Sequence, residues 1–433
     1  MLTYTSTTHA LAKWTVVVYV QASNSLNNFA GKNFADMATV GSTADTNVLI
    51  QWYKPGHEGI WRYKVEKGHL SLDSHLKINT DGSSAKDLID AMTWAVKKYP
   101  AENYGLILWN HGVGILDPVW GESIMKVSAH RVKDNPRAVI EGITQTIPSH
   151  LEPEEFDSLE TIGYRGILFN ERTQTYMDNQ ALIFALETIK NSLLKGKKLK
   201  LLGMDACLMQ MAEVCYQVRN YADLLIASQE VELASGWNYA HFLNALTQTN
   251  NTPAQIAQSV VSGYESTYKN KIQFYTQSAV DLDFMDDIKN GLDLTIACIN
   301  DCKLIPESNI MAIIKKSRES ALQFSATTYI DLYSFYSELR RNLNTSFNTG
   351  KAQSSNRNLL QKITELREVI EINMQLLEKS IIANTAGKYL ARAKGLSIYF
   401  PYNEKIDNSY KKCLFGQESL WLSFLELFSY KKA

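Results

Sequence analysis

The stretch that decides the fold is Lys198–Val218, which reads KLKLLGMDACLMQMAEVCYQV. It opens with a short apolar run that ends at Met204 and is too brief to form a helix of its own. The run breaks at Asp205-Ala206-Cys207. After the break, apolar residues recur at the spacing of a helix face, at Leu208, Met211, Ala212 and Cys215. The pattern predicts a buried strand that leads into a helix.

Cys207 would lie where this strand ends and the helix begins. At such a position, unpaired backbone N–H groups and the positive end of the helix dipole lower the pKa of a thiol, which favours a reactive cysteine. The alternative is a structural cysteine in the core, because cysteine is among the residue types most often buried. This stretch alone leaves both interpretations open.

A second stretch, Tyr104–Gly114, reads YGLILWNHGVG and places a histidine just beyond another apolar run. In open parallel sheets, catalytic groups gather at the carboxyl ends of neighbouring strands. His111 and Cys207 would therefore come together as a Cys–His pair. A single histidine after a strand is usually structural, but the joint occurrence favours catalysis.

These motifs resemble those of the clostripain-like cysteine peptidases, which are relatives of caspases, legumain and gingipains. The resemblance extends from about Trp14 to Phe428, nearly the whole chain. It is carried by NHG at 110–112, LLGMDACLM at 201–209, WTVVVYVQASNSL at 14–26, LLIASQEVELASGWNY at 224–239 and AKGLSIYFP at 393–401. The chain departs from the family at Ser23, which stands where the family usually carries an aspartate.

The resemblance implies a caspase-like fold and peptide-bond hydrolysis by Cys207 and His111. It also implies that the backbone N–H groups of Gly112 and Cys207 hold the oxyanion, and glycine suits that role because it allows a close approach of the backbone. Clostripain-like enzymes cleave after basic residues, and some of them use calcium. The segment that lines the substrate cleft in relatives corresponds here to Ser228, Glu230 and Trp237.

Asp205 is the residue expected to set specificity. Side chains alternate along a strand, so residues 205 and 207 project to the same side. A buried carboxylate is costly unless a cation meets it, and a substrate arginine or lysine would supply that cation. The alternative is that Asp205 caps the N-terminus of the following helix. The resemblance adds Glu230 as a second negative charge.

Composition does not favour a nucleic-acid or membrane partner. Lysine and arginine number 44 against 45 aspartates and glutamates, so bulk charge attracts neither. No stretch approaches the roughly 20 apolar residues of a membrane span. Five cysteines in 433 residues do not make a disulfide framework. We expect a monomer that acts on a peptide or protein substrate.

No cofactor is predicted from the sequence. It contains no EF-hand loop, which leaves calcium dependence open. His57-Glu58 is followed by no second histidine at helical spacing and is interpreted as part of a turn. Residues 1–13 are polar and show no signal peptide. A cytoplasmic protein, a trimmed mature form and export by another route all fit this start.

Apolar runs alternate with helical patterns, which predicts an α/β fold with a mainly parallel central sheet flanked by helices. Residues 14–285 would form the caspase-like catalytic core. Helical patterning dominates residues 286–386, which predicts a helical subdomain inserted before the last strand. That last strand is expected at Gly395–Phe400. Residues 387–433 would pack back on the core with this strand and a closing helix.

Residues 119–165, between the histidine and cysteine strands, show weak periodicity and contain Pro136, Pro148 and Pro153. Both features are typical of exposed, protease-accessible chain. Relatives of the clostripain type mature by a cut between these strands. We therefore hypothesise self-cleavage in this segment, with an inert surface insertion as the alternative. The candidate sites are Lys126, which is favoured because it lies closest to His111 in the sequence, and Arg131, Lys133 and Arg137.

The sequence thus predicts a cysteine endopeptidase that cuts after arginine or lysine through an acyl-enzyme. The competing hypothesis is an inactive caspase-like scaffold that acts as a binding protein. Retention of His111, Gly112, Asp205 and Cys207 speaks against the scaffold, while Ser23 leaves it open.

Overall fold

A computed structural model describes residues 11–56, 59–116, 167–347 and 356–428. Its centre is a sheet with the strand order β12-β10-β9-β8-β5-β1-β2-β3-β4. The five middle strands run parallel, as the alternation of strands and helices predicts. They are β1 (Ala12–Gln21), β2 (Thr46–Tyr53), β5 (Ala101–Trp109), β8 (Leu199–Asp205) and β9 (Ala222–Ala227).

Antiparallel strands complete the sheet at both edges. β3 (Ile60–Glu66) pairs antiparallel with β2, and β4 (His69–Leu76) extends that edge. At the other edge, β10 (Thr276–Asp281) pairs with β9, and β12 (Ile381–Ala386) pairs with β10. The sequence did not predict β12, because helical spacing continues up to Ile382 and only the pairing with β10 distinguishes the strand.

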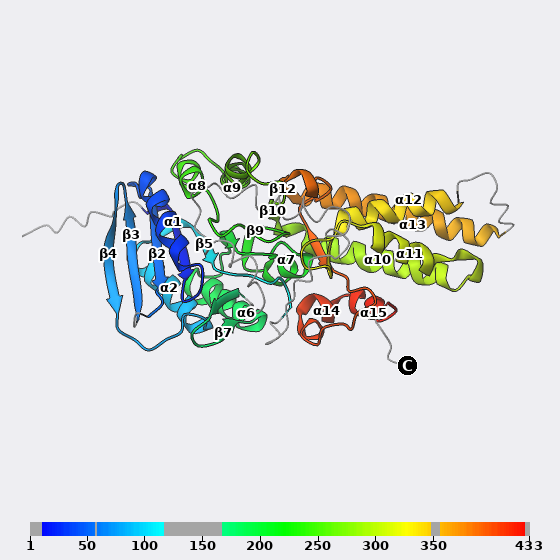
Figure 1. The fold of residues 1–433 in the computed structure, drawn as a ribbon, viewed down its shortest axis with the longest axis horizontal. Coiled ribbons are helices and arrows are strands. Elements are labelled where there is room, and N and C mark those ends of the chain that lie inside the picture. Colours follow the sequence, from blue (N-terminus) through cyan, green and yellow to red (C-terminus); the bar gives the residue numbers. More distant parts are fainter. Residues whose placement is uncertain (1–10, 57–58, 117–166, 348–355, 429–433) are drawn as a thin grey trace, which may run out of the picture.

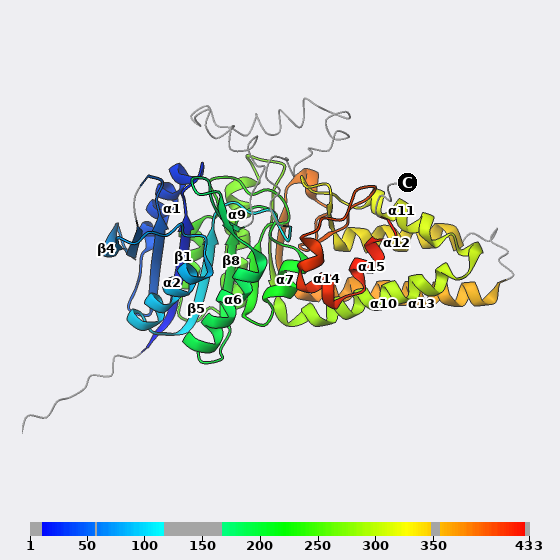
Figure 2. The ribbon, with the colours of Figure 1, turned by 90° about the horizontal axis from the view of Figure 1, so that it is seen from below.

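Helices cover both faces of the sheet (Figures 1 and 2). Successive residues of β1 alternate between the two cores, with Val16 and Val18 in one and Val17 and Tyr19 in the other. One core is closed by α1 (Asn27–Val40), α8 (Tyr239–Leu246) and α9 (Pro253–Tyr268). The other is closed by α2 (Ala85–Lys98), α6 (Asn179–Thr188) and α7 (Ala212–Val218).

A bundle of long helices projects from one end of the molecule (Figure 1). It consists of α10 (Met285–Lys303), α11 (Ile310–Ser320), α12 (Leu332–Phe347) and α13 (Arg357–Ser380). The apolar stripe of α13, which includes Leu359, Ile363 and Ile370, is buried. Burial of such a stripe, rather than helix propensity, supplies most of the stability of a helix in a protein.

The segment expected to be the last strand does not join the central sheet. β13 (Ser397–Tyr399) pairs instead with β11 (Tyr329–Asp331) and forms a bridge to Met211 in the loop after β8. The edge position at β10 is already occupied by β12. The chain continues into α14 (Leu414–Glu418) and α15 (Trp421–Leu425).

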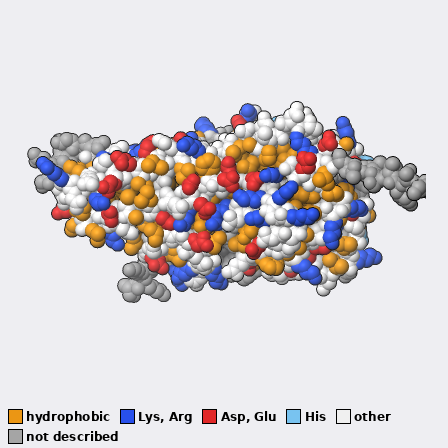
Figure 3. All heavy atoms as spheres, turned by 180° about the vertical axis from the view of Figure 1, so that it is seen from behind, with side chains coloured by type: hydrophobic (Ala, Val, Ile, Leu, Met, Phe, Trp, Pro, Cys, Tyr) orange, Lys and Arg blue, Asp and Glu red, His pale blue; other side chains and the backbone are white. Residues whose placement is uncertain are grey.

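The remaining elements are short. A two-stranded sheet joins β6 (Ile167–Asn170) to β7 (Thr175–Met177). Single helical turns are η1 (Ile189–Leu193), η2 (Leu282–Phe284), η3 (Pro306–Ser308), η4 (Lys388–Leu390) and η5 (Tyr410–Lys412). Acidic and basic side chains are intermixed over the face shown in Figure 3. In the described part of the chain, no helix is long and apolar enough to cross a membrane.

Candidate active site

Cys207 lies two residues beyond the end of β8, in a loop and not at the start of a helix. α7 begins only at Ala212, with Met211 as its N-cap, so the expected lowering of the thiol pKa by a helix N-terminus is wrong. The loop turns because Leu208 has a φ of 63°, a conformation that is strained for a residue with a side chain. The backbone N–H of Leu208 donates to the Glu230 carbonyl over 3.1 Å.

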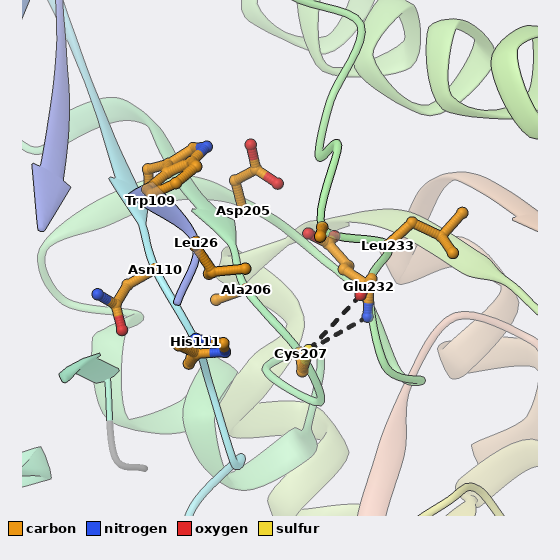
Figure 4. Close-up of a pocket in the computed structure, with 10 residues that line it drawn as sticks. Leu26, Trp109, Asn110, His111, Asp205, Ala206, Cys207, Glu232 and Leu233 are labelled. Carbon is orange, nitrogen blue, oxygen red and sulfur yellow. Dashed lines mark hydrogen bonds between the residues drawn. The ribbon is translucent and has the colours of Figure 1, made fainter. Parts of the chain in front are cut away.

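The sulfur of Cys207 contacts both the N–H and the carbonyl oxygen of Glu232. The N–H of Glu232 donates to Sγ over 3.3 Å, and Sγ lies 3.8 Å from the Glu232 carbonyl oxygen (Figure 4). Only 6% of the Cys207 surface is exposed. The loop after β9 therefore fixes the position of the candidate nucleophile.

His111 follows the adjacent strand β5, and its neighbour Asn110 anchors it. The Asn110 side chain donates to the carbonyl of Phe169 over 3.1 Å and accepts from the N–H of Phe169 over 2.8 Å. The Asn110 N–H donates to the Asp205 carbonyl over 3.2 Å, which ties the histidine loop to the cysteine strand. The imidazole Nε2 lies 3.2 Å from the hydroxyl of Ser25.

His111 and Cys207 line the same pocket, as the joint motif predicts (Figure 4). The cavity measures about 30 Å³, which is room for about two water molecules. Leu26 and Leu233 contribute apolar walls. An arginine or lysine side chain is larger than this space.

Two carboxyl groups, from Asp205 and Glu232, lie in this pocket. Oδ2 of Asp205 accepts a hydrogen bond from the Tyr239 hydroxyl over 2.8 Å, and Oε1 of Glu232 accepts one from the indole N–H of Trp237 over 3.4 Å. Burial raises the pKa of Asp205. Burial, and after it the charge of Asp205, raises the pKa of Glu232 well above its usual range. Because Met211 is the N-cap of α7, Asp205 does not cap that helix.

Gly112 and Gly236 allow close approaches around these groups. A side chain at position 112 would place its Cβ 2.5 Å from the carbonyl oxygen of Cys207. Gly236 has a φ of 64°, and a Cβ there would lie 2.7 Å from an oxygen of Asp205. The backbones of the His111 and Cys207 loops therefore meet only because residue 112 is glycine.

The structure separates the cleft residues expected from the resemblance. Trp237 donates to Glu232 and its ring lies over Gly203 of β8. None of Ser228, Glu230 and Trp237 is among the residues that line the pocket. The Ser228 hydroxyl lies 2.9 Å from the Thr276 carbonyl, to which it donates, and the Glu230 carboxylate accepts from the N–H of Ser325 over 3.1 Å.

Glu232, which the sequence analysis did not select, lines the pocket, whereas Glu230 does not. Both glutamates lie in the sequence SQEVELASGW, two residues apart, and no local pattern distinguishes them. They differ in their contacts. The carboxylate of Glu230 accepts a hydrogen bond from the N–H of Ser325, which lies 95 residues later in the chain. Ser25 was also missed, since a single serine after a strand carries no signal of its own.

Ser23 takes no part in the contact with His111. Its N–H donates to the side chain of Gln21 over 2.7 Å, and its carbonyl accepts from the N–H of Glu171 over 2.9 Å. The candidate self-cleavage sites Lys126, Arg131, Lys133 and Arg137 lie outside the described residues. Within residues 11–56, 59–116, 167–347 and 356–428, no group of three or more His, Cys, Asp or Glu side chains is arranged to hold a metal ion.

Comparison with solved structures identifies the same fold in two bacterial proteases. A secreted C11 cysteine protease from Bacteroides thetaiotaomicron, in complex with an irreversible peptide inhibitor, is 18% identical; the match covers 95% of this chain and 100% of that one, with a TM-score of 0.61. An inactive zymogen C11 protease from Parabacteroides distasonis is 17% identical; the match covers 94% and 98%, with a TM-score of 0.58.

Comparison with curated protein sequences found no match. The sequence profile of the clostripain family, in contrast, matches residues 18–127 and 164–428. The match includes both strands that carry the candidate dyad and the loop that encloses the cysteine. The chain belongs to the clostripain family of cysteine proteases.

Proposed function

We propose that this protease is an endopeptidase that cleaves after arginine or lysine, with Cys207 as nucleophile and His111 as general acid. The observation that carries the proposal is that a buried acidic residue, Asp205, lines the same pocket as both groups. No described lysine or arginine is among the groups that shift the pKa of Asp205. The positive charge of a substrate side chain would supply the cationic partner that Asp205 lacks in the described chain.

In the proposed reaction the Cys207 thiolate attacks the carbonyl carbon before the cleaved bond. The N–H groups of Gly112 and Cys207 hold the resulting oxyanion, and His111 gives a proton to the leaving nitrogen as the C–N bond breaks. Water, losing a proton to His111, then attacks the thioester. The acid product leaves and the thiolate is restored.

Asp205 would select the substrate by charge. A guanidinium can bind a carboxylate through two hydrogen bonds, whereas an ammonium group acts as a point charge. Because the pocket is shielded from water, this attraction is stronger than it would be at the surface. A neutral side chain would bury the carboxylate without a partner.

Self-cleavage in residues 119–165 belongs to the same proposal. The support is the cavity beside Cys207, which is smaller than an arginine or lysine side chain, and the fold shared with a zymogen of P. distasonis. A cut after Lys126, Arg131, Lys133 or Arg137 would sever the direct connection between the His111 loop and the strand before Cys207.

The test compares fluorogenic peptides that end in arginine, lysine, glutamine or leucine. Wild type is expected to cleave the first two, and Cys207→Ala to cleave none. His111→Ala should lose at least a hundred-fold in kcat. Asp205→Asn, which keeps the size of the side chain, should lose the preference for basic residues. Equal cleavage of all four peptides by wild type would exclude the proposed specificity, and an active Cys207→Ala would exclude the nucleophile.

A further inference from the structure

We infer that Glu232 is a second specificity-determining residue, and that Asp205 and Glu232 share one proton in the empty pocket, which is released when a basic side chain binds. These two residues are called the acid pair below. The inference rests on the proposed function. It adds a second acidic residue to the substrate site, and a bound proton whose release would make the preference for basic side chains depend on pH.

The geometry of the acid pair supports a shared proton. The two side chains lie in one pocket and are 5% and 6% exposed. Oε2 of Glu232 is buried and, among the described residues, makes no hydrogen bond of normal geometry. Burial raises the pKa of Glu232, and the Gln277 side-chain amide, itself buried without a partner in the described chain, is the donor that acts on Glu232 and opposes this rise. Two carboxyl groups in contact can hydrogen-bond to each other only if one of them is protonated, because an ionised carboxylate only accepts. A single proton between them satisfies Oε2 and removes the repulsion of two buried charges.

The surroundings of the acid pair supply donors but no described cation. The Tyr239 hydroxyl binds Asp205, and Trp237 Nε1 binds Glu232. The titratable and polar groups that act on the pair or share its pocket are Tyr239 from α8, Tyr264 from α9, Gln277 from β10, and His111 and Cys207. Asp36 from α1 acts on Tyr239 and not on the pair. Burial first, and then the charge of the other acid, raises the pKa of Glu232, so the empty pair retains a proton.

Glu230 shows what a structural glutamate in the same loop looks like. Both of its carboxylate oxygens accept hydrogen bonds from the N–H of Ser325, and Oε1 also accepts one from Val231. Glu232 differs because one oxygen makes no hydrogen bond of normal geometry in the described chain and its side chain lines the pocket. In addition, the backbone of Glu232 contacts Cys207 Sγ. One residue therefore supplies an acid of the pocket and positions the candidate nucleophile.

Binding of a basic side chain would change the balance of charge. The empty pair holds two carboxyl groups and one proton, with a net charge of −1. When the cation enters, it takes the place of the proton between the oxygens, the proton passes to solvent, and two carboxylates face one guanidinium or ammonium. Since one proton leaves for each substrate bound, acid conditions oppose binding, by up to about ten-fold per pH unit.

The test uses reporters that end in arginine or in citrulline, which has nearly the same shape but no charge. The ratio of their kcat/KM values is measured from pH 5 to 9, because ionisation of His111 and Cys207 affects both reporters and cancels in the ratio. In wild type the ratio should rise with pH. In Glu232→Gln it should be at least ten-fold lower at pH 8 and should vary less with pH, mainly through KM. Glu232→Asp should restore the pH-dependent rise.

The matched control is Glu230→Gln, which retains Oε1 for Val231 and Ser325 and should behave as wild type. If wild type prefers arginine but its ratio is independent of pH, or if Glu232→Gln matches Glu230→Gln, the inference is overturned while the proposed function stands. If wild type shows no preference for arginine over citrulline at any pH, the proposed specificity fails and the inference fails with it. If Glu232→Gln does not fold, the inference is tested by the kinetics of Glu232→Asp and by the pH dependence of the wild-type ratio.

Discussion

The hydroxyl of Ser25 lies 3.2 Å from Nε2 of His111. Ser25 belongs to the loop between β1 and α1, and Asn24 holds that loop in place. The Asn24 side chain donates to the carbonyl of Phe169 over 3.1 Å and accepts from the N–H of Leu26 over 2.9 Å. One ring nitrogen of the candidate general acid is therefore tied to a rigid loop. Orientation of a catalytic base by a third group is a recurring feature of nucleophilic catalysis.

Ser25→Ala should lower kcat about ten-fold and leave KM nearly unchanged. The reason is that a lost hydrogen bond worth roughly 1–1.5 kcal/mol would leave the imidazole less well oriented in the transition state. Ser25→Thr keeps the hydroxyl and should recover most of the activity. Steady-state kinetics across pH, with an arginine reporter, measures both effects.

Ser23→Ala is the control for this change, because the described contacts of Ser23 are made by its backbone. It should show the kinetics of wild type. If Ser25→Ala keeps the kcat and the pH profile of wild type, Ser25 does not orient His111. If Ser23→Ala is the damaging variant, then the residue that replaces the family aspartate has a role that its contacts do not explain.

Gly112→Ala should reduce kcat/KM by at least a hundred-fold. The added Cβ would lie 2.5 Å from the Cys207 carbonyl oxygen and 2.9 Å from the side chain of Met209, so the His111 and Cys207 loops must separate. Loss of one oxyanion donor alone costs about a hundred- to a thousand-fold in rate. Kinetics and the thermal midpoint should be measured together.

Gly31→Ala is the matched control for that substitution. Gly31 lies within α1, and apart from its own stretch of helix no atom lies within 4 Å of a Cβ placed there. Alanine should leave activity unchanged and stabilise the fold by up to about 1 kcal/mol, since glycine is unfavourable inside a helix. Full activity in Gly112→Ala would mean that the two loops tolerate separation and that the oxyanion is held elsewhere.

The sequence was sufficient for the features that depend on local pattern. The apolar runs of β5 and β8 were predicted from the sequence, because burial imposes a local pattern on each element separately. The approach of His111 to Cys207 followed from the rule that parallel strands end at one edge.

Features that depend on distant partners could not be predicted. The loop between Cys207 and α7 is set by the strained backbone of Leu208 and by the bridge from Met211 to Ser397, which is 186 residues away. The assignment of β12 and β13 depends on which strand reaches the edge of β10. The N–H of Ser325 binds the Glu230 carboxylate, and it is Glu232 and not Glu230 that lines the pocket. None of these contacts produces a periodic pattern in the sequence of the residues that make it.

Glu213 should make the stability of the protein depend on pH. It lies on α7, where Oε1 accepts from the Tyr399 N–H over 2.9 Å and from the Tyr410 hydroxyl over 3.0 Å, while Oε2 is buried without a donor in the described chain. Burial raises the pKa of Glu213 from 4.5 to about 7. Between these values the folded protein binds a proton that the unfolded chain has lost. The contribution of Glu213 to stability is therefore fully present below pH 4.5 and is lost as pH rises through about 7.

Glu213→Gln, which keeps the accepting oxygen, removes this dependence. The pKa difference of 2.5 units, from 4.5 to 7, corresponds to about 3 kcal/mol. The variant should thus gain up to about 3 kcal/mol over wild type when both are moved from pH 5 to pH 8 in denaturant unfolding. The comparison between variants is necessary because burial also raises the pKa of Asp331, to about 6. An equal pH dependence in both proteins would show that Glu213 does not titrate in this range.

The last prediction concerns maturation. Purified wild type should separate into two fragments on a denaturing gel, whereas Cys207→Ala should remain one chain, because the cut requires the protein's own nucleophile. Intact mass then identifies the site among Lys126, Arg131, Lys133 and Arg137, with Lys126 favoured for its closeness to His111 in the sequence. Lys126→Gln is the matched variant, and it should stay uncut or shift to the next basic residue. Incubation of Cys207→Ala with active wild type distinguishes cleavage between molecules from cleavage within one. A wild-type enzyme that is fully active yet remains a single chain would show that cleavage is not required, and residues 119–165 would then be an insertion with no part in activation.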